Sequence, residues 1–195
     1  MPILVVIRGL SLRFMKEIIV ILHNIRSLHN VGSIFRTADA VGCKKIYLCG
    51  ITPSPIDRFG KYRQQLTKVS LGAEKSVAWE KVGSTTKLID KLRRSEKVGA
   101  GGYKIFAVEQ SKKSIPYYRV KRQASSVKKI ALVLGNEIKG LPSLILKRAD
   151  KILEIPMKGA MVRQAHHPRH SGRGKESLNV AVAFGIVAFN LVFGK

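Results

Sequence analysis

Three stretches in the last third of the chain decide its fold: Ile130-Ala-Leu-Val-Leu-Gly-Asn-Glu137, Ile152-Leu-Glu-Ile-Pro-Met-Lys-Gly159 and Ser177-Leu-Asn-Val-Ala-Val-Ala-Phe-Gly185. The first two begin with short apolar runs, Ile130–Leu134 and Ile152–Ile155, each of which ends in a loop rich in glycine, proline and polar residues. Such runs, when helices follow them, are typical of a parallel α/β sheet. Because open α/β sheets bind ligands at the carboxyl ends of their strands, Gly135–Gly140 and Pro156–Glu176 are the predicted small-molecule site.

The rest of the chain continues this alternation of strands and helices, which predicts a parallel sheet flanked by helices, with right-handed crossovers. Further strands are expected at Ile18–Leu22, Lys45–Cys49, Ser76–Trp79 and Lys104–Val108, and helices at Val31–Val41, Thr85–Lys97, Pro142–Arg148 and Leu178–Phe193. Asn30 is a candidate cap for the first helix. The last helix is apolar nearly all round, which favours packing against the sheet on one side and a second subunit on the other.

The composition indicates a folded protein with a polyanionic partner. The chain has 195 residues, is 45% hydrophobic, and carries a formal charge of +24 from 36 Lys and Arg against 12 Asp and Glu. A basic surplus of this size favours nucleic acid, because contacts to phosphates supply most non-specific affinity for nucleic acids. An acidic membrane surface and a non-catalytic RNA-binding role remain competing interpretations.

The cysteines and the N-terminus bear on the compartment and on the domain boundary. Cys43 and Cys49 lack the CxxC spacing of a zinc or redox motif and do not suggest a disulfide framework, so a reducing, cytoplasmic compartment is expected. Residues 1–14 resemble a signal segment only loosely, because no small-residue cleavage site follows them. We expect them to be an extension that precedes a single domain over residues 15–195.

No common nucleotide-binding motif is present. GxGxxG does not follow the first strand, and GxxxxGK[ST] is absent. Three polar clusters remain beside the expected strand ends: Asn30 with Arg36, Gly135-Asn136-Glu137, and Ser177 with Asn179.

These clusters resemble the three motifs of the SpoU (TrmH-like) branch of the SPOUT RNA methyltransferases. The stretches that carry the resemblance are Asn24-Ile-Arg-Ser-Leu-His-Asn30-Val-Gly-Ser-Ile-Phe-Arg36-Thr-Ala-Asp-Ala-Val-Gly42, Leu132-Val-Leu-Gly-Asn-Glu-Ile-Lys-Gly-Leu-Pro142, and Ile155-Pro-Met-Lys-Gly159 continued by Ser177-Leu-Asn-Val-Ala-Val-Ala-Phe-Gly185. The similarity covers nearly all of residues 16–193. Three motifs in the family's order are a specific signal, whereas any one alone would be weak.

The resemblance implies transfer of a methyl group from S-adenosylmethionine to a ribose 2′-hydroxyl of tRNA or rRNA. It further implies a C-terminal segment threaded into a deep trefoil knot, and a homodimer with no membrane association. A basic RNA-binding protein of the same fold that has lost turnover is the alternative.

The resemblance also assigns candidate catalytic residues. Arg36 matches the family's catalytic arginine, acting either as a general base or, since arginine stays protonated, by clamping a phosphate and stabilising the developing alkoxide. Asn30 and Glu137 match the first and second motifs; Glu137 orders its loop or Asn30, acts directly, or simply caps a helix. Ser177 and Asn179 match the third motif, and the structural alternative makes Ser177 the cap of the last helix, with Asn179 in its first turn. The cofactor-binding residues implied by the resemblance are Val108, Leu134, Gly135, Ile155, Met157, Ser177 and Leu178.

Two departures from the family pattern affect these assignments. Ile138 stands where the family usually has glycine, so a positive φ there would be strained. Residues Ala160–Gly174 form an insertion where the family has only a few residues. We expect a flexible insertion first, added RNA contacts from its arginines second, and a metal site from its histidines third; the residues concerned are Arg163, Arg169, Arg173, His166, His167 and His170.

Overall fold

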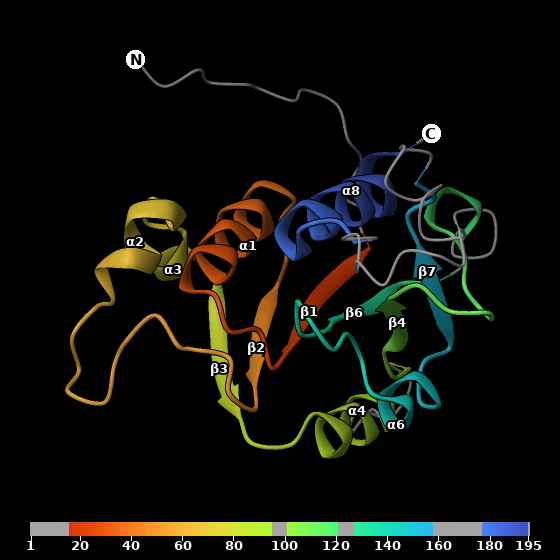
Figure 1. The fold of residues 1–195 in the computed structure, drawn as a ribbon, viewed down its shortest axis with the longest axis horizontal. Helices are drawn as coiled ribbons and strands as arrows, with labels where there is room; N and C mark the ends of the chain where they lie inside the picture. The colour runs from red at the N-terminus through yellow and green to blue at the C-terminus, as the bar shows by residue number, and fades with distance from the viewer. Residues whose placement is uncertain (1–15, 95–100, 121–126, 158–176, 195) are drawn as a thin grey trace, which may run out of the picture.

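The computed structural model describes residues 16–94, 101–120, 127–157 and 177–194. These ranges contain a seven-stranded sheet in the order β3-β2-β1-β6-β4-β7-β5, in which every neighbouring pair is parallel (Figure 1). The predicted parallel sheet is therefore confirmed. The strands are β1 (Glu17–His23), β2 (Lys45–Cys49), β3 (Ala78–Val82), β4 (Lys104–Val108), β5 (Ile115–Pro116), β6 (Lys129–Leu134) and β7 (Lys151–Glu154).

The apolar runs form the strands because their side chains are buried on both faces of the sheet. In β1, Ile18, Val20 and Leu22 point into one core, while Ile19 and Ile21 point into the other. This continuous burial explains why the runs have no polar alternation.

Helices cover both faces of the sheet (Figure 1). One face carries α1, α2, α3 and α8, and the other carries α4 and α6. The helices are α1 (Leu28–Ala40), α2 (Gln64–Ser70), α3 (Ala73–Ser76), α4 (Thr85–Arg93), α6 (Ser143–Leu146) and α8 (Val180–Phe193), with a 3-10 turn at Tyr117–Arg119. None of the helices in the described ranges has the length and apolar character that a bilayer crossing requires.

Several boundaries differ from the predictions, and each difference has a local cause. The first helix begins at Leu28 because the Ser27 hydroxyl caps it, so Asn30 is not the cap. The predicted strand at Ser76–Trp79 begins later, because Ser76 still belongs to α3. Strand β5 was not predicted, since two residues are too few to show a pattern.

From its basic composition, the sequence segment Arg58–Lys68 is expected to be a mobile segment over the site. Instead, Ile56 and Tyr62 form an antiparallel bridge, and α2 begins at Gln64. Helix α2 packs against α1, where an added Cβ at Gly32 would lie 2.6 Å from the carbonyl oxygen of Leu66. That prediction is therefore wrong: packing against α1 holds the segment at the β3 side of the sheet (Figure 1).

Candidate functional site

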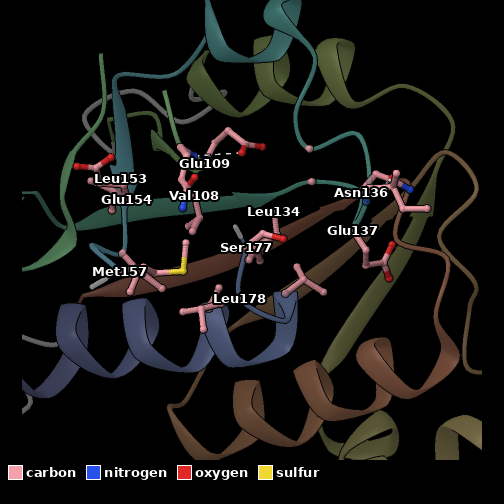
Figure 2. A pocket seen from close by; sticks show the side chains of 17 residues that line it. Val108, Glu109, Leu134, Asn136, Glu137, Leu153, Glu154, Met157, Ser177 and Leu178 are labelled. Carbon is pink, nitrogen blue, oxygen red and sulfur yellow. Dashed lines mark hydrogen bonds between the residues drawn. The ribbon is translucent and has the colours of Figure 1, made fainter. Parts of the chain in front are cut away.

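A pocket opens at the carboxyl ends of β4, β6 and β7, where the predicted small-molecule site lies (Figure 2). The empty space within it is about 770 Å³, a volume that includes the part open to solvent. The N-terminal end of α8 closes one side, and the Met157 side chain points into the pocket from the β7 side. All seven predicted cofactor-binding residues line it: Val108, Leu134, Gly135, Ile155, Met157, Ser177 and Leu178.

The loop after β6 forms one wall and depends on two glycines. An added Cβ at Gly135 would lie 2.6 Å from the carbonyl carbon of Gly140. Gly140 has a φ of +62°, and its added Cβ would lie 2.3 Å from Oε2 of Glu109. The same Glu109 oxygen accepts a hydrogen bond from the Leu141 N–H at 2.7 Å. Glu109 therefore fixes the end of this loop.

Asn136 fixes the other half of the loop. Its Oδ1 accepts hydrogen bonds from the N–H groups of Ile138 and Lys139, both at 3.0 Å, and its Nδ2 donates to the Asn24 carbonyl at 2.8 Å. Among the described residues, only Asn24 and Leu71 combine a side chain with a positive φ. The φ of Ile138 is therefore not positive, so isoleucine causes no backbone strain at this position, where the family usually has glycine. Its side chain is 77% exposed.

Three of the predicted catalytic residues form one hydrogen-bonded chain. Asn30 Nδ2 donates to Glu137 Oε1 at 3.0 Å, and Asn179 Nδ2 donates to Asn30 Oδ1 at 3.0 Å. Asn179 Oδ1 accepts from the N–H groups of Ala181 and Val182, at 2.8 and 3.4 Å. This chain joins the start of α1, the β6 loop and the start of α8.

Glu137 also binds the backbone that leads into α1. Its two oxygens accept from the N–H groups of Arg26 and Ser27, each at 3.2 Å. Partial burial alone would raise the pKa of Glu137, but hydrogen bonds from its own backbone N–H, from Asn30 and from Arg26 and Ser27 lower it below the usual 4.5. The structure thus gives Glu137 contacts with Asn30 and with the backbone just before α1, whereas the cap of α1 itself is the Ser27 hydroxyl.

In the third motif, the alternative in which Ser177 caps the last helix is wrong. Asn179, not Ser177, is the N-cap of α8. Ser177 instead lines the pocket, next to Leu134 and Leu178 in Figure 2. It is exposed and free to meet a ligand from the pocket wall.

Arg36 lies apart from this group. It is exposed on α1, six residues after Asn30, and it does not line the pocket. Six residues correspond to about 9 Å along a helix and to a different face. Within the described ranges, no salt bridge joins Arg36 to an acid.

Sequence reasoning missed Glu109, Glu154 and Asn24. Glu109 directly follows β4 and lines the pocket, so the rule that ligands bind at strand ends would have indicated it. Glu154 lines the pocket and accepts a hydrogen bond from the Ser114 hydroxyl at 2.6 Å. Asn24 has a φ of +56°, which the sequence does not reveal.

Known proteins share this sequence and this fold. Residues 17–162 match the SpoU rRNA Methylase family. The tRNA (guanosine(18)-2′-O)-methyltransferase of Aquifex aeolicus is 31% identical over 175 residues, which cover 89% of this chain and 68% of the relative. The 23S rRNA (guanosine-2′-O-)-methyltransferase RlmB of Haemophilus influenzae is 26% identical, over 90% of this chain and 59% of the relative.

Solved structures agree. The AdoMet-bound rRNA methyltransferase of Sinorhizobium meliloti matches with a TM-score of 0.70 and 26% identity, over 91% of this chain and 56% of that one. The TrmH/SpoU tRNA modifying enzyme of A. aeolicus matches with a TM-score of 0.67 and 28% identity, over 90% of this chain and 74% of that one. The present chain thus spans little more than half the length of several relatives. It belongs to the SpoU rRNA methylase family.

Proposed function

We propose that this protein transfers the methyl group of S-adenosylmethionine to a ribose 2′-hydroxyl of tRNA or rRNA. The observation that carries the proposal is the pocket at the ends of β4, β6 and β7, which Glu137 lines and to which Asn30 and Asn179 are joined by a chain of hydrogen bonds through Glu137. The relatives named above are 2′-O-methyltransferases of tRNA and of rRNA, so either RNA fits the family.

The chemistry of the pocket fits the cofactor. Its walls combine apolar side chains, such as Leu134 and Met157, with backbone groups at the strand ends. Three glutamate residues, Glu109, Glu137 and Glu154, are among those that line it, although the chain as a whole carries a charge of +24. The negative charges of these residues attract a cation such as the sulfonium of S-adenosylmethionine. When bound, that cofactor supplies an activated methyl group for transfer to an oxygen nucleophile.

The residues of the chain have distinct roles in this proposal. Arg36 stays protonated and therefore positions the target phosphate and stabilises the developing alkoxide, while the hydroxyl proton passes to solvent. Ser177 contacts the cofactor or the hydroxyl from the pocket wall. Asn30, Glu137 and Asn179 position these groups by holding the three loops together.

We further propose a homodimer that associates through α8. Val182, Phe189 and Phe193 are 51%, 44% and 44% exposed, and their spacing of seven and eleven residues places them on one face of the helix. Such an apolar stripe is typical of an interface.

The family also implies a trefoil knot, which forms part of the proposal. The passage between Met157 and Ser177 that would thread it, together with the insertion Ala160–Gly174, lies outside the described residues, as do residues 1–14. The arginines and histidines of the insertion lie there too.

Free, buried Cys43 and Cys49 agree with a reducing compartment, which supports a cytoplasmic location.

Calorimetric titration with S-adenosylmethionine, followed by methyl transfer to unmodified tRNA and rRNA transcripts, tests the proposal. A variant lacking Ala160–Gly174 is titrated in parallel. We expect both proteins to bind the cofactor, and transfer to stop when the target ribose is replaced by 2′-deoxyribose. Failure of the full chain to bind, with binding restored in the deletion variant, would contradict the proposal and favour a non-catalytic RNA-binding protein.

A further inference from the structure

The segment between β2 and α2 forms an ordered hairpin, residues 56–62, which we call the aromatic hairpin. Its ends pair in an antiparallel bridge between Ile56 and Tyr62. The Asp57 N–H donates to the Lys61 carbonyl at 2.9 Å, and Asp57 Oδ1 accepts from the N–H groups of Phe59 and Lys61, at 2.8 and 3.0 Å. The tip is therefore held in one conformation.

The hairpin presents aromatic rings to solvent. Phe59 at its tip is 70% exposed, and Tyr62 is 48% exposed. Each ring has a cation over one of its faces: the Arg58 guanidinium carbon lies 4.7 Å from the Phe59 ring centroid, and Lys75 Nζ lies 5.4 Å from that of Tyr62. A solvent-exposed ring with a cation over one face is suited to unpaired nucleotides, because a base stacks on the other face while the cation meets the backbone.

The charge around the hairpin is basic and unneutralised. Arg58, Lys61, Arg63, Lys68 and Lys75 lie in or next to it, and in the described parts of the chain no salt bridge joins them to an acid. The two acids of this segment are otherwise engaged, because Asp57 binds backbone N–H groups and Glu74 is buried against Ser70.

The hairpin and the pocket lie along the same edge of the sheet. The hairpin follows the carboxyl end of β2, and the pocket lies at the carboxyl ends of β4, β6 and β7. Asn24 connects the two regions, since its Oδ1 accepts from the Ile51 N–H at 3.0 Å and its carbonyl accepts from Asn136 at 2.8 Å. The hairpin and the pocket therefore lie at the carboxyl edge of one sheet, on opposite sides of β1 (Figure 1).

We propose that the aromatic hairpin stacks an unpaired base of the substrate RNA on Phe59, so that it acts as a second contact point away from the reacting ribose. This inference rests on the proposed function, because it takes the substrate to be RNA. RNA fits better than a membrane surface. Each pair of a ring and a cation can bind one base and one phosphate, whereas insertion into lipid needs a broader apolar area.

Fluorescence anisotropy of the full chain with a labelled single-stranded RNA of about 12 nucleotides, and with a fully paired RNA duplex, tests this proposal. Phe59→Ala and Phe59→Leu are expected to weaken single-strand binding about tenfold, while Phe59→Trp retains it. Phe59→Leu is the matched variant, since it keeps an apolar side chain and removes only the ring. Leu144→Ala, at an exposed apolar residue of α6, controls for loss of surface area and leaves binding unchanged.

Salt dependence separates stacking from charge. Phe59→Ala leaves the slope of log affinity against log salt unchanged, whereas Arg58→Gln reduces it by about 0.7. Single-strand affinity in Phe59→Ala equal to that of the wild type would overturn the hairpin proposal, as would an equal loss for the duplex. Phe59-dependent binding to phosphatidylserine vesicles with unchanged RNA affinity would also overturn it.

Failure of the hairpin is distinguishable from failure of the proposed function. Cofactor binding and methyl transfer by the wild type, together with unchanged RNA affinity in Phe59→Ala, would overturn the hairpin alone. Phe59-dependent RNA binding by a wild type that binds no S-adenosylmethionine would instead overturn the enzyme assignment and retain the hairpin.

Discussion

At the scale of single residues, Asn30 shows how the site is held. Its amide donates to Glu137 and accepts from Asn179, so both ends of the group are engaged. The same carboxylate of Glu137 also accepts from two backbone N–H groups before α1. The ionisation of the Glu137 carboxyl group therefore affects α1, the loop after β6 and, through Asn30, α8.

Glu137→Gln gives a pH-dependent change in stability. The pKa of Glu137 is lowered in the folded protein, so the unfolded chain takes up a proton first as the pH falls below about 4.5. The carboxylate thus stabilises the fold above that pH, and the contribution is lost as the pH falls through the folded pKa. Urea unfolding at several pH values should show the wild-type advantage over Glu137→Gln shrinking in acid. Glu80→Gln, which removes an exposed carboxylate of β3 that pairs with Lys45 at the surface, is the control and should show a smaller pH dependence. A wild-type advantage over Glu137→Gln that does not depend on pH would contradict the assignment.

Arg36→Ala should lower kcat about 100-fold or more, because a cation that stabilises developing charge acts mainly in the transition state. The Kd for S-adenosylmethionine should not change, since Arg36 does not line the pocket. Methyl transfer assays and calorimetry measure the two quantities separately. Lys87→Ala, at an exposed residue of α4, controls for the loss of one positive charge; undiminished activity in Arg36→Ala would refute the assignment.

At the scale of elements, close packing of α1 against α2 depends on Gly32. An added methyl group there would lie 2.6 Å from the Leu66 carbonyl oxygen and 3.1 Å from the Val69 Cβ. Gly32→Ala should therefore lower the free energy of unfolding by about 1–3 kcal/mol, because α2 must move away. Gly185→Ala in α8 is the matched change: its nearest neighbour is Thr37 Cγ2 at 3.8 Å, so the higher helix propensity of alanine should add about 0.5–1 kcal/mol.

Urea denaturation of the two alanine variants checks the opposite signs. Equal shifts in the same direction would show that helix propensity, not the distance between α1 and α2, decides the effect at Gly32. A destabilised Gly32→Ala that still binds S-adenosylmethionine normally would place the effect in the helix pair and not in the pocket.

The elements themselves were largely predictable, and the exceptions have a common cause. Runs such as Ile130–Leu134 are apolar because both of their faces are buried, which gives a strong local signal. Ser27 and Asn179 as caps were missed because the sequence offered a neighbouring polar residue in each case, and only the backbone dihedrals decide between them. The hairpin at residues 56–62 was missed because its order comes from Asp57 contacts that have no periodic pattern.

At the scale of the whole molecule, motif residues were predictable and their partners were not. The resemblance identified Asn30, Glu137 and Asn179, but only the three-dimensional structure joins them, since 107 residues separate the first two and 149 separate Asn30 from Asn179. Glu109 was missed because its role depends on contact with Leu141, 32 residues further along the chain. Sequence patterns therefore predicted which loops border the pocket but not what fixes their conformation.

The charge distribution of the whole molecule predicts that its two ligands respond differently to salt. RNA affinity should fall steeply as salt rises, because the net charge of +24 acts on a polyanion. Affinity for S-adenosylmethionine should change little, because that contact is confined to a partly enclosed pocket. Anisotropy and calorimetry over the same salt series measure the two dependences; parallel slopes would contradict the separation of an RNA surface from the cofactor pocket.

The exposed face of α8 predicts the oligomeric state. Phe189 and Phe193 lie with ring centroids 5.7 Å apart and together with Val182 expose one apolar stripe. Burial of this stripe in a homodimer removes apolar surface from water, so light scattering should give twice the 21.6 kDa mass of the chain. Phe189→Glu should give the monomer mass, because the interface would then bury a charge. Leu144→Glu, which places the same charge on α6, should remain dimeric; a wild type that is monomeric at every concentration would exclude the α8 interface.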